Sequence, residues 1–169
     1  MSQDLNATNK KKQDKYNRIK TQISELLTKC ELPEARMASI LAVLHHKMKG
    51  FFWTGFYTLH NDRLIVKMYQ GPVACMELKK NTGVCWSAVN QQKAIVVTDV
   101  HAFPGHIACD GRSKSEVVVP LFDDKQNLIG VLDIDSDSLN TFDFIDADNL
   151  KDILAMIYTI PYKKPENLL

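Results

Sequence analysis

The clearest indication of the fold is the segment Ser115-Glu116-Val117-Val118-Val119-Pro120-Leu121-Phe122, which a polar turn at 123–127 connects to Leu128-Ile129-Gly130-Val131-Leu132-Asp133-Ile134-Asp135. Both runs are apolar, rich in β-branched residues and of strand length, and the turn consists of Asp, Lys, Gln and Asn. The pattern predicts a β-hairpin, whose two strands pair antiparallel.

A second hairpin is predicted upstream of the first. The aromatic, Thr-rich run at 51–59 ends in a polar turn at 60–63, and the segment 63–69 reads as the returning strand. Shorter strands are expected at 73–78 and 94–97. The predicted sheet is therefore mainly antiparallel.

Along the sequence, helices are predicted before, between and after these strands. Pro33 opens one helix, which Gly50 ends, a short helix follows Gly83, and Thr141 and Asp143 can cap a last one. Three stripes at three- and four-residue spacing support the long helices: Tyr16, Ile19, Ile23, Leu26, Leu27 and Cys30; Met37, Ile40, Leu41, Leu44 and Met48; Leu150, Ile153, Leu154 and Ile157. This order of elements predicts an α+β domain with helices largely on one side of the sheet.

Length and composition predict one globular domain. The chain has 169 residues, 45% hydrophobic and 24% charged, and we expect a polar tail at 1–13, the domain at 14–160 and a second tail at 161–169. Its 21 basic and 20 acidic residues give a net charge of +1, which argues against a nucleic-acid partner. No apolar run is long enough to span a membrane, and the first residues lack a secretory signal core, so a cytoplasmic location is expected.

The four cysteines fall into two groups. Cys30 lies on the first apolar stripe and is expected in the core, whereas Cys75, Cys85 and Cys109 lie in turn-like or loop-flanking sequence. Without a secretory signal a static disulfide framework is not expected. Metal ligands, redox or nucleophilic thiols, and scattered core residues remain as interpretations of these three.

Zinc is the weaker of these interpretations, and neither a metal nor a cofactor is expected. The chain has no C-x-x-C pair, although His101, His106 and Cys109 leave a mixed site open. The setting for redox chemistry is better. Cys85 lies where a helix starts, which lowers the pKa of a thiol, and Cys109 lies close to His106 and Arg112. A thiolate oxidised to a sulfenic acid is captured by a neighbouring cysteine as a disulfide.

Acidic and aromatic residues share faces of the predicted strands. Asp133 and Asp135 alternate with apolar residues, so both carboxylates point to the same side, which is either exposed to solvent or part of a cation-binding pocket. Glu116 opens the preceding strand and favours the pocket. Trp53 shares its face with Gly55 and Tyr57, so its indole either belongs to the core or stands over a cavity floored by the glycine.

Several segments resemble one known family, the free methionine-(R)-sulfoxide reductases, which are built on a single GAF domain. The likeness runs from about residue 14 to 160, and the three spaced cysteines distinguish this family from GAF domains that only bind ligands. The segments that carry it are Trp53-Thr54-Gly55-Phe56-Tyr57, Gly83-Val84-Cys85, Gly105-His106-Ile107-Ala108-Cys109-Asp110, Ser115-Glu116-Val117-Val118-Val119-Pro120-Leu121 and Ile129-Gly130-Val131-Leu132-Asp133-Ile134-Asp135-Ser136.

The resemblance implies an oxidoreductase that reduces free L-methionine-(R)-S-oxide to methionine, with thioredoxin as the usual reductant. A free amino acid carries an ammonium group, which Glu116, Asp133 and Asp135 are suited to bind, and one carboxyl kept protonated can donate to the sulfoxide oxygen. We expect Trp53 to pack against the methylthio end and Tyr57 to shape that wall.

The thiols then have expected roles. Cys109 is favoured as the attacking thiol because its loop also carries His106, Cys85 is its rival, and Cys75 is expected to resolve the sulfenic acid. A homodimer is common for GAF domains. Two alternatives stand beside this reading: a GAF sensor that binds a small ligand without catalysis, and a hydrolase that uses Cys109 with His106.

Overall fold

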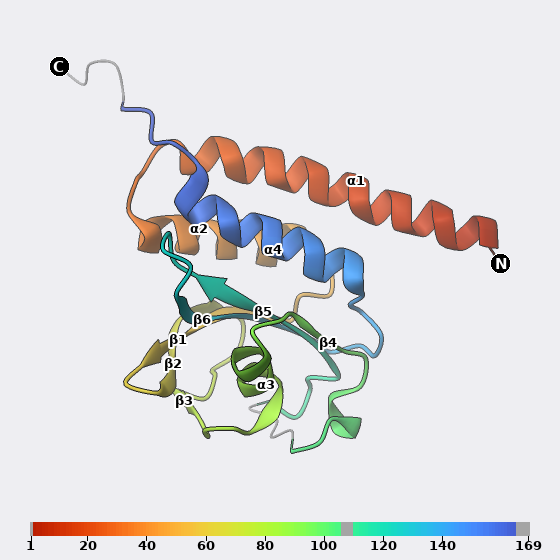
Figure 1. The fold of residues 1–169 in the computed structure, drawn as a ribbon. Coiled ribbons are helices and arrows are strands. Elements are labelled where there is room, and N and C mark those ends of the chain that lie inside the picture. The colour runs from red at the N-terminus through yellow and green to blue at the C-terminus, as the bar shows by residue number, and fades with distance from the viewer. Residues whose placement is uncertain (1, 106–109, 165–169) are drawn as a thin grey trace.

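The strands form one six-stranded sheet in which every neighbouring pair is antiparallel (Figure 1). The computed structural model describes residues 2–105 and 110–164, and the strand order in the sheet is β3-β2-β1-β6-β5-β4. The bounds are β1 Trp53–His60, β2 Arg63–Gln70, β3 Glu77–Leu78, β4 Ile95–Val97, β5 Ser115–Phe122 and β6 Leu128–Ser136. The two predicted hairpins are β1–β2 and β5–β6, whereas β3 is much shorter than expected.

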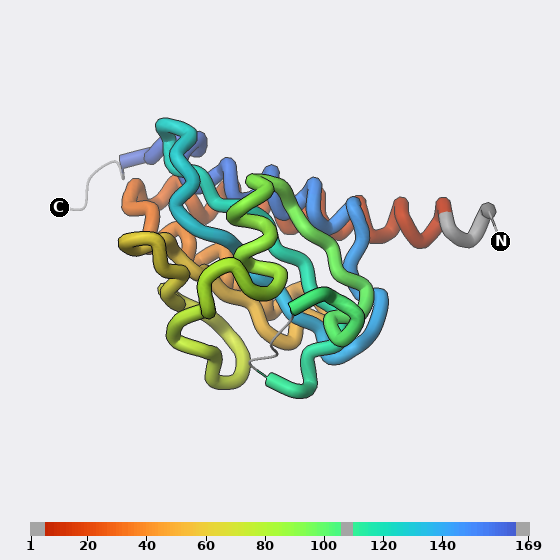
Figure 2. The backbone as a smooth tube through the Cα atoms, turned by 60° about the horizontal axis from the view of Figure 1, so that its bottom comes forward, coloured from red at the N-terminus to blue at the C-terminus, as the bar shows by residue number. Residues whose placement is uncertain are grey.

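Within the described residues, four α-helices flank the sheet. They cover its two faces unequally (Figures 1 and 2). They are α1 Ser2–Leu27, α2 Pro33–Lys47, α3 Gly83–Gln91 and α4 Phe144–Thr159, with a short 3₁₀ helix at Val100–Ala102. Helices α2 and α4 cover one face of the sheet and α1 packs on both of them, while α3 lies on the opposite face. The predicted α+β architecture, with helices largely on one side, is confirmed.

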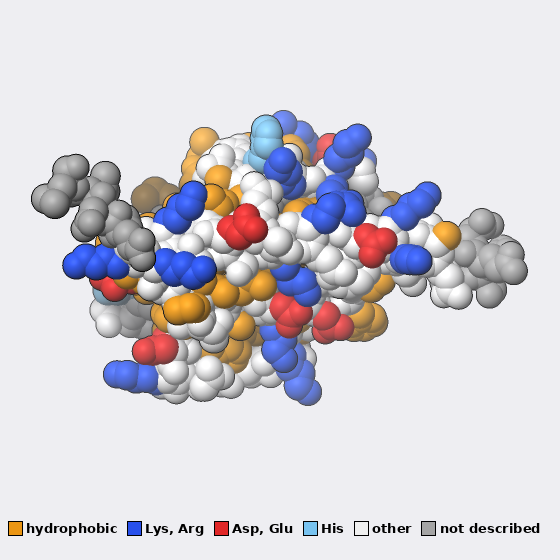
Figure 3. Space-filling view, turned by 90° about the horizontal axis from the view of Figure 1, so that it is seen from above, with side chains coloured by type: hydrophobic (Ala, Val, Ile, Leu, Met, Phe, Trp, Pro, Cys, Tyr) orange, Lys and Arg blue, Asp and Glu red, His pale blue; other side chains and the backbone are white. Residues whose placement is uncertain are grey.

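Helix α1 begins at Ser2, earlier than expected, and contacts α4 through residues near its middle. The ammonium group of Lys12 lies 2.8 Å from Asp143 and 2.6 Å from Asp146, and the Tyr16 hydroxyl donates to Asp146 at 2.8 Å. Asp143 and Asp146 also form the capping box that starts α4. Polar residues near the N-terminus are therefore helical and anchored. Helices α1, α2 and α4 together form a helical layer on one side of the sheet. Figure 3 looks onto this helical layer and shows basic and acidic side chains interspersed along it.

A buried arginine closes the other end of the helical layer. Arg36 donates to the carbonyl oxygens of Cys30, Ile157 and Ile160, at 2.6 to 2.8 Å. Ile157 lies in the last turn of α4, Ile160 is the C-cap of that helix and Cys30 follows the end of α1, so all three carbonyls lie where helices leave acceptors unpaired. Cys30 is a half-buried free thiol in the α1–α2 connection and not the core residue that the stripe predicted, because α1 ends at Leu27.

The alternation of side chains along the strands divides the buried residues into two clusters. Leu132 and Ile134 of β6 belong to the large apolar cluster between the sheet and the helical layer. Val131, on the opposite side, belongs to a smaller cluster with Trp53 and residues of α3. Among the described residues, no helix combines the length and apolar character that spanning a bilayer requires. The smaller cluster borders the candidate site.

Candidate functional site

Three neighbouring strands bring the predicted acidic and aromatic residues together on the α3 side of the sheet. Asp135 of β6 pairs with Trp53 of β1 on one side and with Glu116 of β5 on the other. Two residues further along, Asp133 pairs with Gly55. Since residues two apart on a strand share a face, these side chains point to the same side.

These side chains line a pocket of about 200 Å³ between the sheet, the first turn of α3 and the segment that precedes it. Cys75 and Cys85 line the same pocket, whereas Cys109 and His106 lie outside the described residues. Together with Cys75 and Cys85, the predicted residues in the lining are Trp53, Tyr57, Glu116, Asp133 and Asp135. The geometry matches the interpretation that Asp133 and Asp135 line a pocket, and not the alternative that they are exposed to solvent.

The indole of Trp53 lies over Gly55 and also belongs to the smaller buried cluster, so the structure combines the two positions that the sequence left open. A Cβ atom at Gly55 would lie 2.2 Å from Cη2 of Trp53, so a side chain there would displace the ring. The indole also stacks on Tyr57 and on Tyr69, with ring centroids 5.7 and 5.4 Å apart, and its Nε1 donates to the carbonyl of Pro72 at 3.1 Å. One wall of the pocket is thus a rigid aromatic surface.

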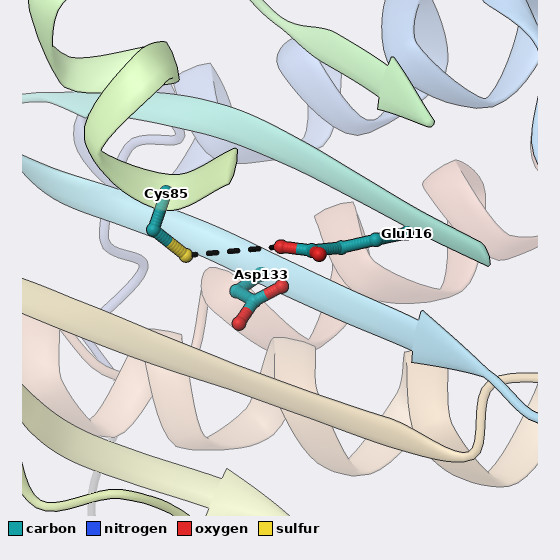
Figure 4. Close-up of side chains that lie close together, drawn as sticks. All are labelled: Cys85, Glu116 and Asp133. Carbon is teal, nitrogen blue, oxygen red and sulfur yellow. Dashed lines mark hydrogen bonds between the residues drawn. The ribbon is translucent and has the colours of Figure 1, made fainter. Parts of the chain in front are cut away.

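A thiol and two carboxylates converge at the floor of the pocket (Figure 4). Sγ of Cys85 lies 4.0 Å from Oε1 of Glu116, and one donor atom each of Cys85, Glu116 and Asp133 lies within 4.8 Å of the others. All three side chains are buried. Oδ1 of Asp133 is buried without a hydrogen-bond partner in the described structure, which is costly for a carboxylate unless a ligand supplies a donor or a cation.

Burial and mutual repulsion shift the protonation of the three pocket acids. Burial raises the pKa of Asp133 to about 6. The pKa values of Glu116 and Asp135 are raised well above their usual range by burial and then by the charge of Asp133. Carboxyls this close do not all ionise together near neutral pH, so the pocket holds both proton-donating and negatively charged oxygens.

The surroundings of Cys85 disfavour its thiolate. Helix α3 begins at Gly83, as predicted, so Cys85 lies in the first turn. Burial nevertheless raises the pKa of the Cys85 thiol, and the charges of Asp133 and Glu116 raise it further. The expected lowering of this pKa by the helix terminus is wrong, because the carboxylates and the loss of solvent outweigh it.

The remaining predicted groups have other positions. Cys75 is disulfide-bonded and half-buried, and its carbonyl accepts a hydrogen bond from the Tyr57 hydroxyl at 3.0 Å. Arg112 pairs with Asp110 at 2.7 Å and lies 4.8 Å from the ring centroid of Phe52. Of the mixed metal site left open in the sequence, two of the three residues lie outside the described chain.

Two residues that support the site were not predicted from the sequence: Tyr69, which lies behind the pocket lining, and Ser113, which belongs to it. Tyr69 stacks on Trp53 because it pairs with Gly55 across the β1–β2 hairpin, but a register shift between Phe56 and Tyr57 hides this pairing from a simple count. Ser113 is a hydrogen-bonding neighbour of Asp135 at the pocket. Its position at the end of the long loop, two residues before β5, was the available signal.

Known proteins resemble this chain in sequence and in structure. The GAF domain family matches residues 33–155. GAF domain-containing protein A of Dictyostelium discoideum is 44% identical over 159 residues, covering 93% of this chain and 99% of that protein. Free methionine-R-sulfoxide reductase of Escherichia coli is 40% identical over 134 residues, covering 77% and 81%. The structure of free methionine-R-sulfoxide reductase from Neisseria meningitidis in complex with its substrate is 39% identical with a TM-score of 0.79, covering 85% and 86%.

Proposed function

This chain belongs to the free methionine-(R)-sulfoxide reductase family of GAF domains, and we propose that it reduces free L-methionine-(R)-S-oxide to L-methionine in the pocket between α3 and the sheet. The observation that carries the proposal is the buried carboxylate of Asp133, which has an oxygen without a partner among the described residues and lies beside two further acids and a thiol. Relatives and a substrate complex with this family name support the reaction class.

The acids suit the part of the substrate that distinguishes a free amino acid from a residue in a chain. An ammonium group donates up to three hydrogen bonds, and Glu116, Asp133 and Asp135 offer acceptors on one side of the pocket. A methionine oxide within a polypeptide has an amide in place of this ammonium. The size of about 200 Å³ is also below the roughly 300–1,000 Å³ of pockets for drug-sized ligands, which fits a single amino acid.

The aromatic wall suits the other end of the substrate. Trp53 stacks on Tyr57 and Tyr69 and also lines the pocket, so the part of its ring that faces the pocket is a fixed apolar surface. A methyl group beside an aromatic ring gains dispersion and sulfur–aromatic contacts. With the ammonium at the acids and the methyl group at Trp53, the sulfoxide sulfur points toward the thiol side of the pocket.

The proposed chemistry uses two thiols and conserves every atom. The Cys109 thiolate attacks the sulfoxide sulfur, a carboxyl group protonates the oxygen, and the oxygen passes to Cys109 as a sulfenic acid while methionine leaves. The Cys75 thiol then attacks the sulfenic sulfur, a disulfide forms and water departs. The methionine sulfur gains the two electrons that the two cysteines lose.

Three features of the structure support these roles. The raised pKa of Cys85 makes that thiol a poor nucleophile near neutral pH, which weighs against the rival assignment. Cys75 is disulfide-bonded whereas Cys85 is free, as expected for a resolving cysteine and a bystander. The raised pKa of Glu116 supplies a protonated carboxyl to act as the acid.

Thioredoxin is the proposed reductant that returns the disulfide to thiols. Cys75 lies in an irregular segment whose neighbours Val73 and Met76 are exposed to 83% and 77%. Exposed apolar side chains beside a disulfide suit a protein dithiol that must approach it closely. A reducing compartment is required for recycling, so the proposal retains the cytoplasmic location.

The decisive experiment is stereospecific. We expect turnover of the free R epimer with dithiothreitol, and none of the free S epimer or of the R oxide inside a peptide. Turnover of the peptide oxide at a comparable rate would contradict the role given to the ammonium group. Omitting the reductant is the control, which limits product to one equivalent per enzyme.

Single-turnover assays of cysteine variants test the roles of the thiols. Cys109→Ser should release no methionine, Cys75→Ser should release one equivalent and stop at the sulfenic acid, and Cys30→Ser is the matched control. Normal single-turnover release by Cys109→Ser would transfer the attacking role to another thiol.

A non-catalytic sensor is the second candidate function. The relative from Dictyostelium discoideum is named only for its GAF domain, which leaves this function open to the chain. A sensor would bind the sulfoxide saturably and release no methionine in the single-turnover assay, so the same experiment separates the two functions.

A further inference from the structure

Cys85, Glu116 and Asp133 bring three ligand atoms together from three different elements. Cys85 is in the first turn of α3, Glu116 is on β5 and Asp133 is on β6, and Figure 4 shows the three side chains pointing toward one another. The proposed reductase reaction uses the two carboxyl groups but has no role for the Cys85 thiol. A free, buried thiol facing two acids therefore asks for a separate explanation.

We propose that Cys85, Glu116 and Asp133 form a binding site for a borderline-soft divalent metal ion such as Zn²⁺ or Cd²⁺, in the same pocket as the amino acid substrate. One thiolate with two carboxylates is a ligand set that Zn²⁺ accepts. This inference goes beyond the proposed reductase function, because neither the reaction nor its thiol steps require a metal.

The distances suit such an ion after small side-chain rotations. Zinc bonds of about 2.3 Å to sulfur and about 2.1 Å to oxygen place the ligand atoms of a tetrahedral site roughly 3.4–3.6 Å apart. Sγ of Cys85 and Oε1 of Glu116 are 4.0 Å apart, and all three donor atoms fall within 4.8 Å. The backbone therefore already holds the three ligands within reach of one ion.

The unpartnered oxygen of Asp133 is an independent indication of a cation. Asp133 is 7% exposed, lines the pocket, and leaves Oδ1 without a hydrogen bond in the described part of the chain. A dication would satisfy this oxygen and neutralise two of the three negative charges of a thiolate and two carboxylates. The thiol proton and any proton on the carboxyls pass to solvent as the ion binds.

Three protein ligands leave a fourth position that faces the pocket. Water or another small ligand completes the tetrahedron there. Since Glu116 and Asp133 are also the proposed partners of the substrate ammonium, metal and substrate should exclude one another. A metal ion bound at this site would then inhibit the enzyme reversibly.

Cobalt titration tests the metal site without any turnover. Protein prepared without reductant, with Cys75 disulfide-bonded as in the structure, is titrated with Co²⁺ while the near-ultraviolet sulfur-to-cobalt charge-transfer band is recorded. We expect a saturable band at one equivalent, which Zn²⁺ abolishes by displacement. Absence of the band, or failure of Zn²⁺ to displace it, would overturn the proposal.

Matched variants identify the ligands. Cys85→Ala should lose the band and Cys30→Ala should keep it; a band that survives in Cys85→Ala would exclude this site. Asp133→Asn, checked for folding by circular dichroism, should weaken Co²⁺ binding at least about 100-fold, because removing a ligand costs no less than removing its supporting contacts. Asp135→Asn removes a pocket acid outside the ligand cluster and should keep the band. Unchanged affinity in folded Asp133→Asn would contradict the assignment.

Inhibition kinetics link the metal to the pocket. Zn²⁺ should raise the apparent KM for methionine sulfoxide without changing kcat, and a chelator should restore the KM. Loss of kcat with no change in KM would place the inhibitory ion elsewhere. If the protein has no reductase activity, the cobalt spectrum still decides the metal site, so the two proposals fail separately.

Discussion

The two faces of strand β6 differ in what they contribute: one face packs in the core of the fold, and the other lines the candidate site. Leu132 and Ile134 point toward α2 and α4 and are fully buried among apolar side chains. Asp133 and Asp135, which alternate with them, point toward the pocket and bring carboxyl groups to it. Because side chains alternate in direction along a strand, neighbouring residues of β6 contribute to the core on one face and to the pocket on the other.

The faces also differ in how their buried polar groups are paired. In the helical layer Asp146 receives hydrogen bonds from Tyr16 and Lys12, and Arg36 donates to three carbonyl oxygens. On the pocket face Oδ1 of Asp133 has no partner in the described structure. Asp146 and Arg36 thus find their partners within the helical layer, whereas the pocket face leaves an acceptor for the proposed ligand.

The largest expected effect is on the helical face. Leu132→Ala removes a fully buried side chain and should lower the free energy of unfolding by about 2–5 kcal/mol, because it leaves a cavity. Urea denaturation measures this loss. The activity per folded molecule should change little; a loss of activity without a loss of stability would break the separation between the faces.

The neighbouring residue should behave in the opposite way. Asp133→Asn should lower kcat/KM for free methionine sulfoxide about 10²–10³-fold, the cost of removing one fixed electrostatic partner. Its free energy of unfolding at pH 8 should not fall, because an unpaired buried charge is removed. Near-normal kcat/KM in a folded Asp133→Asn protein would contradict the proposed site.

Gly55→Ala tests the aromatic wall. A methyl group at this position overlaps the indole of Trp53, which Tyr57 and Tyr69 hold in place, so we expect a destabilisation of about 1–3 kcal/mol. The fluorescence of Trp53 should change and the KM should rise. Trp53→Leu is the companion variant, because it removes the overlap with the indole but not the one with Cβ of Tyr69, 2.7 Å from the added methyl group; adding Gly55→Ala to Trp53→Leu should therefore cost less stability than Gly55→Ala costs in the original protein. An unchanged KM in Gly55→Ala would contradict the wall.

The pocket face should also give stability a dependence on pH. The pKa of Asp133 is raised to about 6 in the folded protein, above the ordinary value of 3.8, so the folded state keeps a proton that the unfolded chain has lost. The contribution of this residue to stability therefore falls as pH rises from about 4 to about 6, by about 1.4 kcal/mol per unit of pKa shift. Urea denaturation across this range should show a smaller fall for Asp133→Asn; equal slopes would contradict the shift.

The smallest effect is expected at the start of α4. Asp143→Ala removes the N-cap and one partner of Lys12, and should lower the free energy of unfolding by about 1 kcal/mol. The kcat/KM should stay unchanged, because this residue lies in the helical layer. Any fall in kcat/KM measured well below the melting temperature would show that the two faces are coupled.

Much of the fold followed from local patterns in the sequence. The two hairpins and the stripes of α2 and α4 were predicted because apolar spacing and turn residues act over a few positions. The early start of α1 was not, since Lys12 bonds to Asp143 and Asp146, more than 130 residues away along the chain. Such contacts depend on the finished packing, which no short segment encodes.

The candidate site was predictable to the same extent. Alternation placed Asp133 and Asp135 on one face, and the glycine two residues after Trp53 indicated where the indole lies. The partnership of Tyr69 with Trp53 depends on a register shift inside β1, and the raised pKa of Cys85 depends on acids from other strands. Composition and spacing carry no information on either.

The position of α1 has a practical consequence for handling the protein. Its first turns extend beyond the sheet, while α3 lies on the opposite side (Figures 1 and 2). The pocket lies on the α3 side. A tether attached at this end would hold the molecule by its back and leave the pocket open to the solution. Protein immobilised in this way on an electrode or a sensor chip would present all its binding sites in the same orientation.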